Sequence, residues 1–227
     1  MMLSGWKSIL EAGLTHVGGK AWNLARLARY GFAIPAGQAI PATAYRQWLA
    51  ASRLEPELIA AAEQPDDQRA AALAAVTARL AEIPSGVDLS VLAGGPLAVR
   101  SSALQEDAAT TSFAGIHISC LNVQGAAAVE IAVRKVWLSL WTATAVAYRQ
   151  RMGLSHTEAA MAVLIMPLVA AKTSGIAFTR DPISGRDDRL VIHAVHGLGE
   201  SLVGGMTTGV SMCWPKTIST TVSACLR

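Results

Sequence analysis

The sequence has 227 residues, of which 52% are apolar and only 15% are charged, with a formal net charge of +3 at neutral pH. This length supplies enough apolar side chains for the core of one large domain or two small ones. Because the net charge is small and basic clusters are missing, the composition argues against nucleic acid or an anionic membrane surface as a partner.

The sequence carries no predicted signal for export or membrane insertion. Glu11 interrupts the apolar start, so a signal peptide is not expected. The longest apolar run, residues 159–171, contains Pro167 and is shorter than the roughly 20 residues that a bilayer requires. The three cysteines lack the spacing of a metal site and indicate reduced thiols. We therefore expect a cytoplasmic protein without a membrane partner.

The first part of the chain is predicted to be helical. Helical periodicity covers residues 21–30, a segment that begins at Thr43, and the alanine-rich residues 56–82. Gly31 is expected to end the first of these helices, and Pro65 to break the last one.

The second part is predicted to be rich in strands. Apolar and alternating runs predict strands over residues 97–100, 116–123, 161–169, 174–181 and 189–195. Residues 126–151 have the spacing of one long amphipathic helix. Only a few residues around Lys172 separate the third and fourth strands, so these are expected to form a hairpin. The predicted fold class is α+β, or mixed α/β.

Residues 97–115, LAVRSSALQEDAATTSFAG, combine a short apolar strand ending in Arg100 with hydroxyl side chains and a loop closed by Gly115. An arginine at the end of a buried strand needs an anionic partner, because burying an unpaired charge is costly. Its planar guanidinium suits phosphate oxygens. The alternative partner is the carboxylate of Glu106 or Asp107, and these residues alone leave both interpretations open.

The segment GLTHVGGKA places two glycines and a lysine before a helix. It is not a Walker P-loop, because Gly19 intervenes between Gly18 and Lys20, and Ala21 replaces the magnesium-binding hydroxyl. Exposed backbone amides at a helix start, together with a lysine, nevertheless favour a bound phosphate. A solvated lysine without a ligand is the alternative interpretation.

Other patterns do not support a dinucleotide site or a hydrolase. Residues 197–205 have Leu202 where a Rossmann fingerprint requires its third glycine, and they are better interpreted as a mobile glycine-rich loop. Ser101 and Ser102 lack the surroundings of a nucleophile elbow. The histidines have no pair at ligand spacing and are expected to be structural: His16, His117, His156, His193 and His196.

Seven blocks in order resemble the pyruvate phosphate dikinase and phosphoenolpyruvate synthase family. The longest are VGGKAWNLARLARYGFAIPAGQAIPATAYRQWL and AVRSSALQEDAATTSFAG, followed by LNV, AYRQRMG, MAVLIMPLV, SGIAFTRDPISG and HGLGESLVGG. The resemblance covers roughly residues 14–205. It implies an ATP-grasp nucleotide-binding domain, incomplete at its C-terminus. We expect a helical part at residues 1–96, a strand-rich part at residues 97–205, and a divergent tail at residues 206–227.

The resemblance implies which residues hold ATP. Lys20 and Arg100 match the family's phosphate-contacting lysine and arginine, and would stabilise charge on the transferred phosphoryl group. Gly115 matches a glycine whose backbone approaches the nucleotide, and Ser119 keeps the hydroxyl of a threonine that is frequent in relatives. Met166 stands where many relatives place a glutamine beside the adenine, so only a backbone contact is kept there.

The family's activity needs more than these residues. ATP phosphorylates a histidine on a swivelling domain, which passes the phosphate to pyruvate or another acceptor. The family's Mg²⁺ ligands and phosphocarrier histidine have no counterpart in this sequence, so the chain is not expected to be catalytically complete alone. A shifted reading frame or an early stop would account for the divergent tail. The alternatives are a non-catalytic remnant or interaction protein, or one subunit of a split enzyme.

Overall fold

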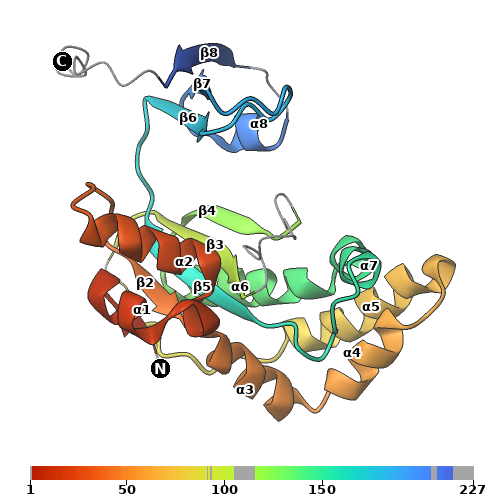
Figure 1. Cartoon of the computed structure of the whole chain (residues 1–227). Helices are drawn as coiled ribbons and strands as arrows, with labels where there is room; N and C mark the ends of the chain where they lie inside the picture. Colours follow the sequence, from red (N-terminus) through yellow and green to blue (C-terminus); the bar gives the residue numbers. More distant parts are fainter. Residues whose placement is uncertain (1, 91, 93, 105–115, 206–208, 217–227) are drawn as a thin grey trace. The chain divides into compact units, whose positions relative to one another are not determined.

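The computed structural model describes residues 2–90, 92, 94–104, 116–205 and 209–216 (Figure 1). The chain divides into two compact units, Met1–Leu168 and Val169–Arg227, each of which is described by itself. All strand pairs in the described ranges are antiparallel, and helices accompany both sheets. The predicted mixed α+β architecture is therefore confirmed, whereas the predicted division at residues 96 and 205 stays a prediction.

The first unit contains a five-stranded sheet with the strand order β1–β2–β5–β3–β4. Its elements are β1 (Leu3–Ser4), α1 (Trp6–Ala12), α2 (Leu14–Arg29), β2 (Gln38–Ile40), α3 (Ala42–Ser52), α4 (Glu55–Ala62), α5 (Asp66–Ala81), β3 (Leu97–Ala103), β4 (Ser119–Val123), α6 (Ala126–Leu138), the 3-10 turn η1 (Ser139–Trp141), α7 (Ala143–Arg151) and β5 (Met161–Pro167). As predicted, the alanine-rich segment forms two helices that part near Pro65, and α2 ends just before Gly31.

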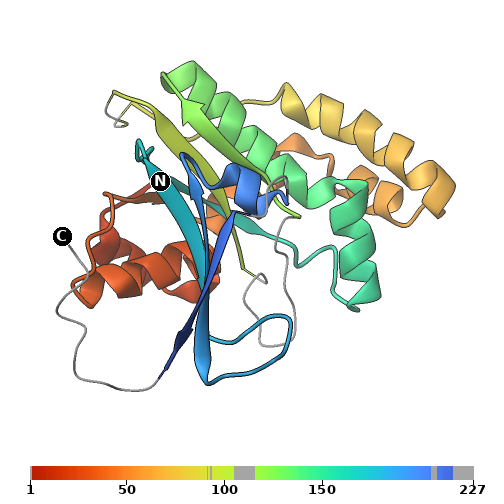
Figure 2. The same cartoon turned by 90° about the horizontal axis from the view of Figure 1, so that it is seen from above.

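Different helices cover the two faces of this sheet. Successive side chains of a strand point to opposite faces. On one face, Val99, Val163 and Ile165 pack in the large core, which includes the aromatic residues of α3 and α6. On the other face, Leu164 packs in a smaller cluster with residues of α1 and α2. Figure 2 shows α1 and α2 on one side of the strands and α6 on the other. We call the side that carries Leu164 the α2 face.

The prediction of one long helix over residues 126–151 is wrong, because the segment contains α6, η1 and α7. The break falls at Thr142, whose backbone is extended, with φ −68° and ψ 149°. Its hydroxyl accepts a hydrogen bond from the Ala145 amide at 3.2 Å, which starts α7 as an N-cap. Trp141 and Arg149, on either side of this break, are both buried.

The second unit is a three-stranded sheet, β6–β7–β8, with one short helix. Its elements are β6 (Thr173–Phe178), β7 (Arg189–His196), α8 (Glu200–Val203) and β8 (Val210–Pro215). The predicted hairpin across Lys172 is wrong, because β5 pairs with β2 and β3 while β6 pairs with β7. Residues 161–165 are all buried, which suits a central strand covered on both faces.

The segment predicted as a glycine-rich loop contains α8. None of the described helices is both long and apolar enough to cross a bilayer.

Candidate functional site

The N-terminal half of α2 approaches β3 very closely. Gly18 has φ +74° and ψ 170°, so it interrupts the helical geometry of α2 and a second helical segment starts after it. A Cβ atom at this position would lie 2.0 Å from the carbonyl oxygen of Ser102. Glycine is therefore required here, both for the left-handed φ and for the close approach. As a result, Lys20 lies in the first turn of a helix that begins against β3.

Ser102 fixes this approach with a side-chain hydrogen bond. Its hydroxyl oxygen accepts a bond from the Ala21 amide at 3.0 Å in a buried position. The hydroxyl thus acts as an N-cap, because it accepts a hydrogen bond from a backbone amide in the first turn of the helix. Unlike a usual N-cap, it comes from a strand 81 residues away in the sequence. Gly18 and Gly19 are buried, so the expectation that their amides are exposed is wrong. Lys20 remains half-buried at the positive end of the helix dipole.

Arg100 and Ser119 lie on the α2 face. Arg100 of β3 is the register partner of Leu164 in β5 and of Ser119 in β4. Paired residues of an antiparallel sheet share a face, and Leu164 belongs to the α2 cluster. Arg100 is half-buried and Ser119 is exposed. Across the described residues, no hydrogen bond or ion pair joins the Arg100 side chain to a carboxylate.

The remaining predicted site residues divide into two groups. Met166 is half-buried near the end of β5 and packs against the α2 cluster. Gly115 lies outside the described residues, as do Glu106 and Asp107, the alternative partners of Arg100. The described members of the predicted site therefore lie on one face of the sheet or on the helix that covers it.

His117, which the sequence predicted to be merely structural, is half-buried in the turn that precedes β4. Burial, and then the nearby cations Lys20 and Arg149, lower the pKa of His117 to about 4. The imidazole is therefore neutral at pH 7.

Arg149 is a second titratable residue that sequence reasoning missed. It is 1% exposed, and burial lowers its pKa to about 10. Its Nε donates to Nδ1 of His156 at 3.1 Å, and its Nη1 donates to the Leu140 carbonyl oxygen at 2.7 Å. The guanidinium also lies 5.3 Å from the ring centroid of Trp141. The burial of Arg149 could have been predicted from helical spacing, because Arg149 lies four residues after Ala145 and three after Val146, on the same face of α7.

The described residues do not supply a metal centre. Within the described ranges, no group of three or more His, Cys, Asp or Glu side chains is arranged so that it could hold a metal ion.

In the second unit, the Ser174 hydroxyl donates a hydrogen bond to the Gly197 carbonyl oxygen at 2.7 Å, which connects the start of β6 to the glycine-rich segment. These contacts organise the loop and add no catalytic group.

The chain belongs to the family described as the pyruvate phosphate dikinase AMP/ATP-binding domain, whose pattern matches residues 14–218. The match continues beyond residue 205 and includes β8. The resemblance drawn from the sequence blocks is thereby confirmed, and its extent is greater than those blocks indicated.

Several curated relatives share this region. Phosphoenolpyruvate synthase from Aeropyrum pernix is 34% identical over 213 residues, covering 85% of this chain and 26% of that protein. Rifampicin phosphotransferase from Streptomyces sviceus is 38% identical over 217 residues, which cover 88% of this chain and 25% of that protein. The prodigiosin synthesizing transferase PigC from Serratia marcescens is 35% identical over 207 residues, which cover 88% of this chain and 22% of that protein. The chain thus spans about a quarter of the length of these relatives.

Proposed function

We propose that this chain is an ATP-binding module of the ATP-grasp type, and that the α2 face holds the polyphosphate of ATP. One observation carries the proposal: Arg100 is half-buried without a described carboxylate partner, on the face covered by the helix that begins at Lys20. A half-buried cation of this kind is suited to a phosphate group, which supplies the missing negative charge. Membership of an AMP/ATP-binding family supports a nucleotide as the source of that phosphate.

Each residue contributes a different interaction to the proposed site. Lys20 supplies a point charge at the positive end of a helix dipole, and Arg100 supplies a planar fork for two phosphate oxygens. The exposed hydroxyl of Ser119 is a hydrogen-bond donor on the same face. Met166 offers an apolar surface and its backbone to the base. Gly115, proposed from the resemblance alone, adds a backbone contact.

We extend the proposal to the role of the module in a larger reaction. ATP bound here phosphorylates a carrier histidine, which passes the phosphate to pyruvate or another acceptor in the cytoplasm. Residues outside this chain, in further domains or in a partner subunit, supply that histidine and the acceptor site. The described residues do not fit a Mg²⁺ site, so no step through the metal is assigned to them. Their own contribution is positioning and charge neutralisation.

Calorimetric titration with ATP tests the binding site. We expect Arg100→Ala to weaken binding by about 1.5–3 kcal/mol, or roughly 10- to 150-fold, the range for hydrogen bonds to charged groups. Arg46→Ala is the matched control, because Arg46 is an exposed arginine of α3, whose apolar residues pack on the opposite face. If the Arg100→Ala variant and the wild type bind ATP with equal affinity, the proposed phosphate site on the α2 face is wrong. Absence of binding heat and of a thermal shift would instead favour a non-catalytic remnant.

A further inference from the structure

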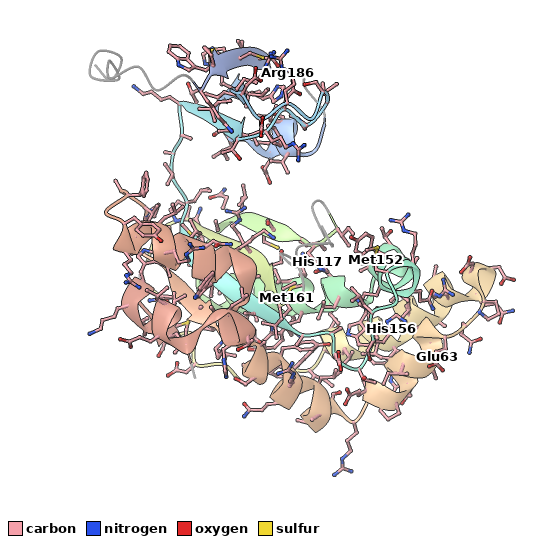
Figure 3. All side chains as sticks on the ribbon, viewed as in Figure 1. Glu63, His117, Met152, His156, Met161 and Arg186 are labelled. Atoms are coloured by element: carbon pink, nitrogen blue, oxygen red, sulfur yellow. The ribbon has the colours of Figure 1, made fainter. Side chains whose placement is uncertain are left out.

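Two residues of β3 connect the proposed phosphate site to the helix that covers it. Arg100 and Ser102 lie two positions apart on the strand, so their side chains point to the same face, with Cα atoms about 7 Å apart. Arg100 is half-buried, whereas Ser102 is fully buried. Ala103, which follows Ser102, pairs with Met161, and the label of Met161 in Figure 3 marks this end of the sheet. One strand therefore carries both the arginine of the site and the contact with α2.

The helical segment that carries Lys20 is capped from this strand. Gly18 precedes the segment with a φ of +74°, and as a glycine it has no side chain that could act as an N-cap. The Ser102 hydroxyl takes that role, because it accepts the hydrogen bond from the Ala21 amide at 3.0 Å. The Gly18 backbone also lies against Ser102, since a Cβ atom added there would be 2.5 Å from the Ser102 carbonyl carbon. The start of the segment is thus held by β3 itself.

We propose that Ser102 is a positioning residue of the phosphate site, which sets where Lys20 lies relative to Arg100. This inference rests on the proposed function. Lys20 directly precedes Ala21, the residue whose amide Ser102 holds. Arg100 lies two residues before Ser102 on the same face. The hydrogen bond therefore links the backbone beside one cation to the strand that carries the other.

A fixed separation between two cations suits a ligand with several linked anionic groups. Such a site has already lost the freedom that binding would otherwise remove, so more of the interaction appears as affinity. The ligand class that fits this arrangement is a polyphosphate, whose neighbouring phosphates can contact Lys20 and Arg100 at the same time.

Ser101 offers a matched control in the same strand. It is also a buried serine, with 1% of its surface exposed. Its register partner Val163 packs in the large core, so Ser101 points to the face opposite α2. Ser101→Ala therefore removes a buried hydroxyl from β3 and leaves the hydrogen bond between Ser102 and Ala21 in place.

Titration of the full chain with ATP and with inorganic tripolyphosphate tests the proposal. Nuclear magnetic resonance detects the binding, because it measures affinities into the millimolar range. We expect Ser102→Ala to weaken the binding of both ligands about tenfold, the effect of losing one hydrogen bond that orders a site. Ser101→Ala should keep the wild-type affinity. In a Lys20→Met background, Ser102→Ala should have little further effect, because the charge that Ser102 positions is already gone.

The outcomes separate this inference from the proposed function. A loss of affinity in Ser102→Ala that is absent from Ser101→Ala and from the Lys20→Met background supports the inference. Wild-type affinity of Ser102→Ala, with weakened binding by Arg100→Ala, would overturn it and leave the proposed function intact. Equal losses in the two backgrounds, or in the two serine variants, would also overturn it, because Ser102 would then act through general stability. Failure of the wild type to bind ATP would overturn both.

A second variant covers the case in which Ser102→Ala does not fold. An ester in place of the Ala21 amide removes the hydrogen-bond donor and leaves the Ser102 side chain in β3. The same tenfold loss is expected from the ester. An ester variant with wild-type affinity for ATP and tripolyphosphate would overturn the inference.

Discussion

The close approach of α2 to β3 predicts that Gly18→Ala is severely destabilising. The new Cβ would lie 2.0 Å from the Ser102 carbonyl oxygen, 2.5 Å from its carbonyl carbon and 2.7 Å from its hydroxyl oxygen. Two costs add to each other. Placing a side chain at φ +74° costs about 1 kcal/mol. Moving α2 away from β3 breaks the buried bond between Ser102 and the Ala21 amide, which costs about 1–3 kcal/mol.

Gly13→Ala is the matched control for this substitution. Gly13 has φ +82°, and a Cβ there would meet nothing within 4 Å, so only the backbone strain applies. We expect the free energy of unfolding, measured with urea, to fall by about 1 kcal/mol in Gly13→Ala and by about 2–4 kcal/mol in Gly18→Ala. Gly18→Ala should also weaken ATP binding, because Lys20 moves with the helix. Equal destabilisation of the two variants would refute the close-approach argument.

The free energy of unfolding should fall by about 3 kcal/mol as the pH drops from about 6.5 to about 4, because His117 binds a proton at higher pH in the unfolded chain than in the folded protein. Acid-unfolding curves of the His117→Gln variant should lack this contribution to the loss of stability. Arg149→Met should lower stability by about 1–3 kcal/mol in urea unfolding, since the Leu140 carbonyl and His156 lose their donor, and an unchanged midpoint would contradict that role. Met166→Gln should tighten ATP binding by about 1 kcal/mol in calorimetry through a hydrogen bond to the base, whereas weaker binding would place the base elsewhere.

The local elements were largely predictable because they follow from periodicity and from glycine and proline positions. The break at Pro65 and the end of α2 at Gly31 are examples. The break at Thr142 was not predicted, because the apolar spacing continues across it and only the N-cap hydrogen bond to Ala145 distinguishes it. The strand pairing of β5 was mistaken because a short connection suggests a hairpin. Its five buried residues in succession point instead to a central strand.

The candidate site was predictable where it depends on residue type, and less so where it depends on contacts far apart in the sequence. Lys20 and Arg100 follow from a lysine after glycines and an arginine in an apolar strand. The contact of Gly18 with Ser102 joins positions more than eighty residues apart, and no local sequence pattern predicts it. The lowered pKa of His117 could not be predicted either, because Lys20 and Arg149, which are distant in the sequence, both contribute to it.

The most direct test of the central claim is a map of backbone amide shifts during titration of the full chain with ATP. We expect saturable shifts centred on Lys20, Arg100 and Ser119, with the amides of α3 unmoved. Saturable shifts confined to α3, α6 or the second unit, with Lys20 and Arg100 unchanged, would contradict the account.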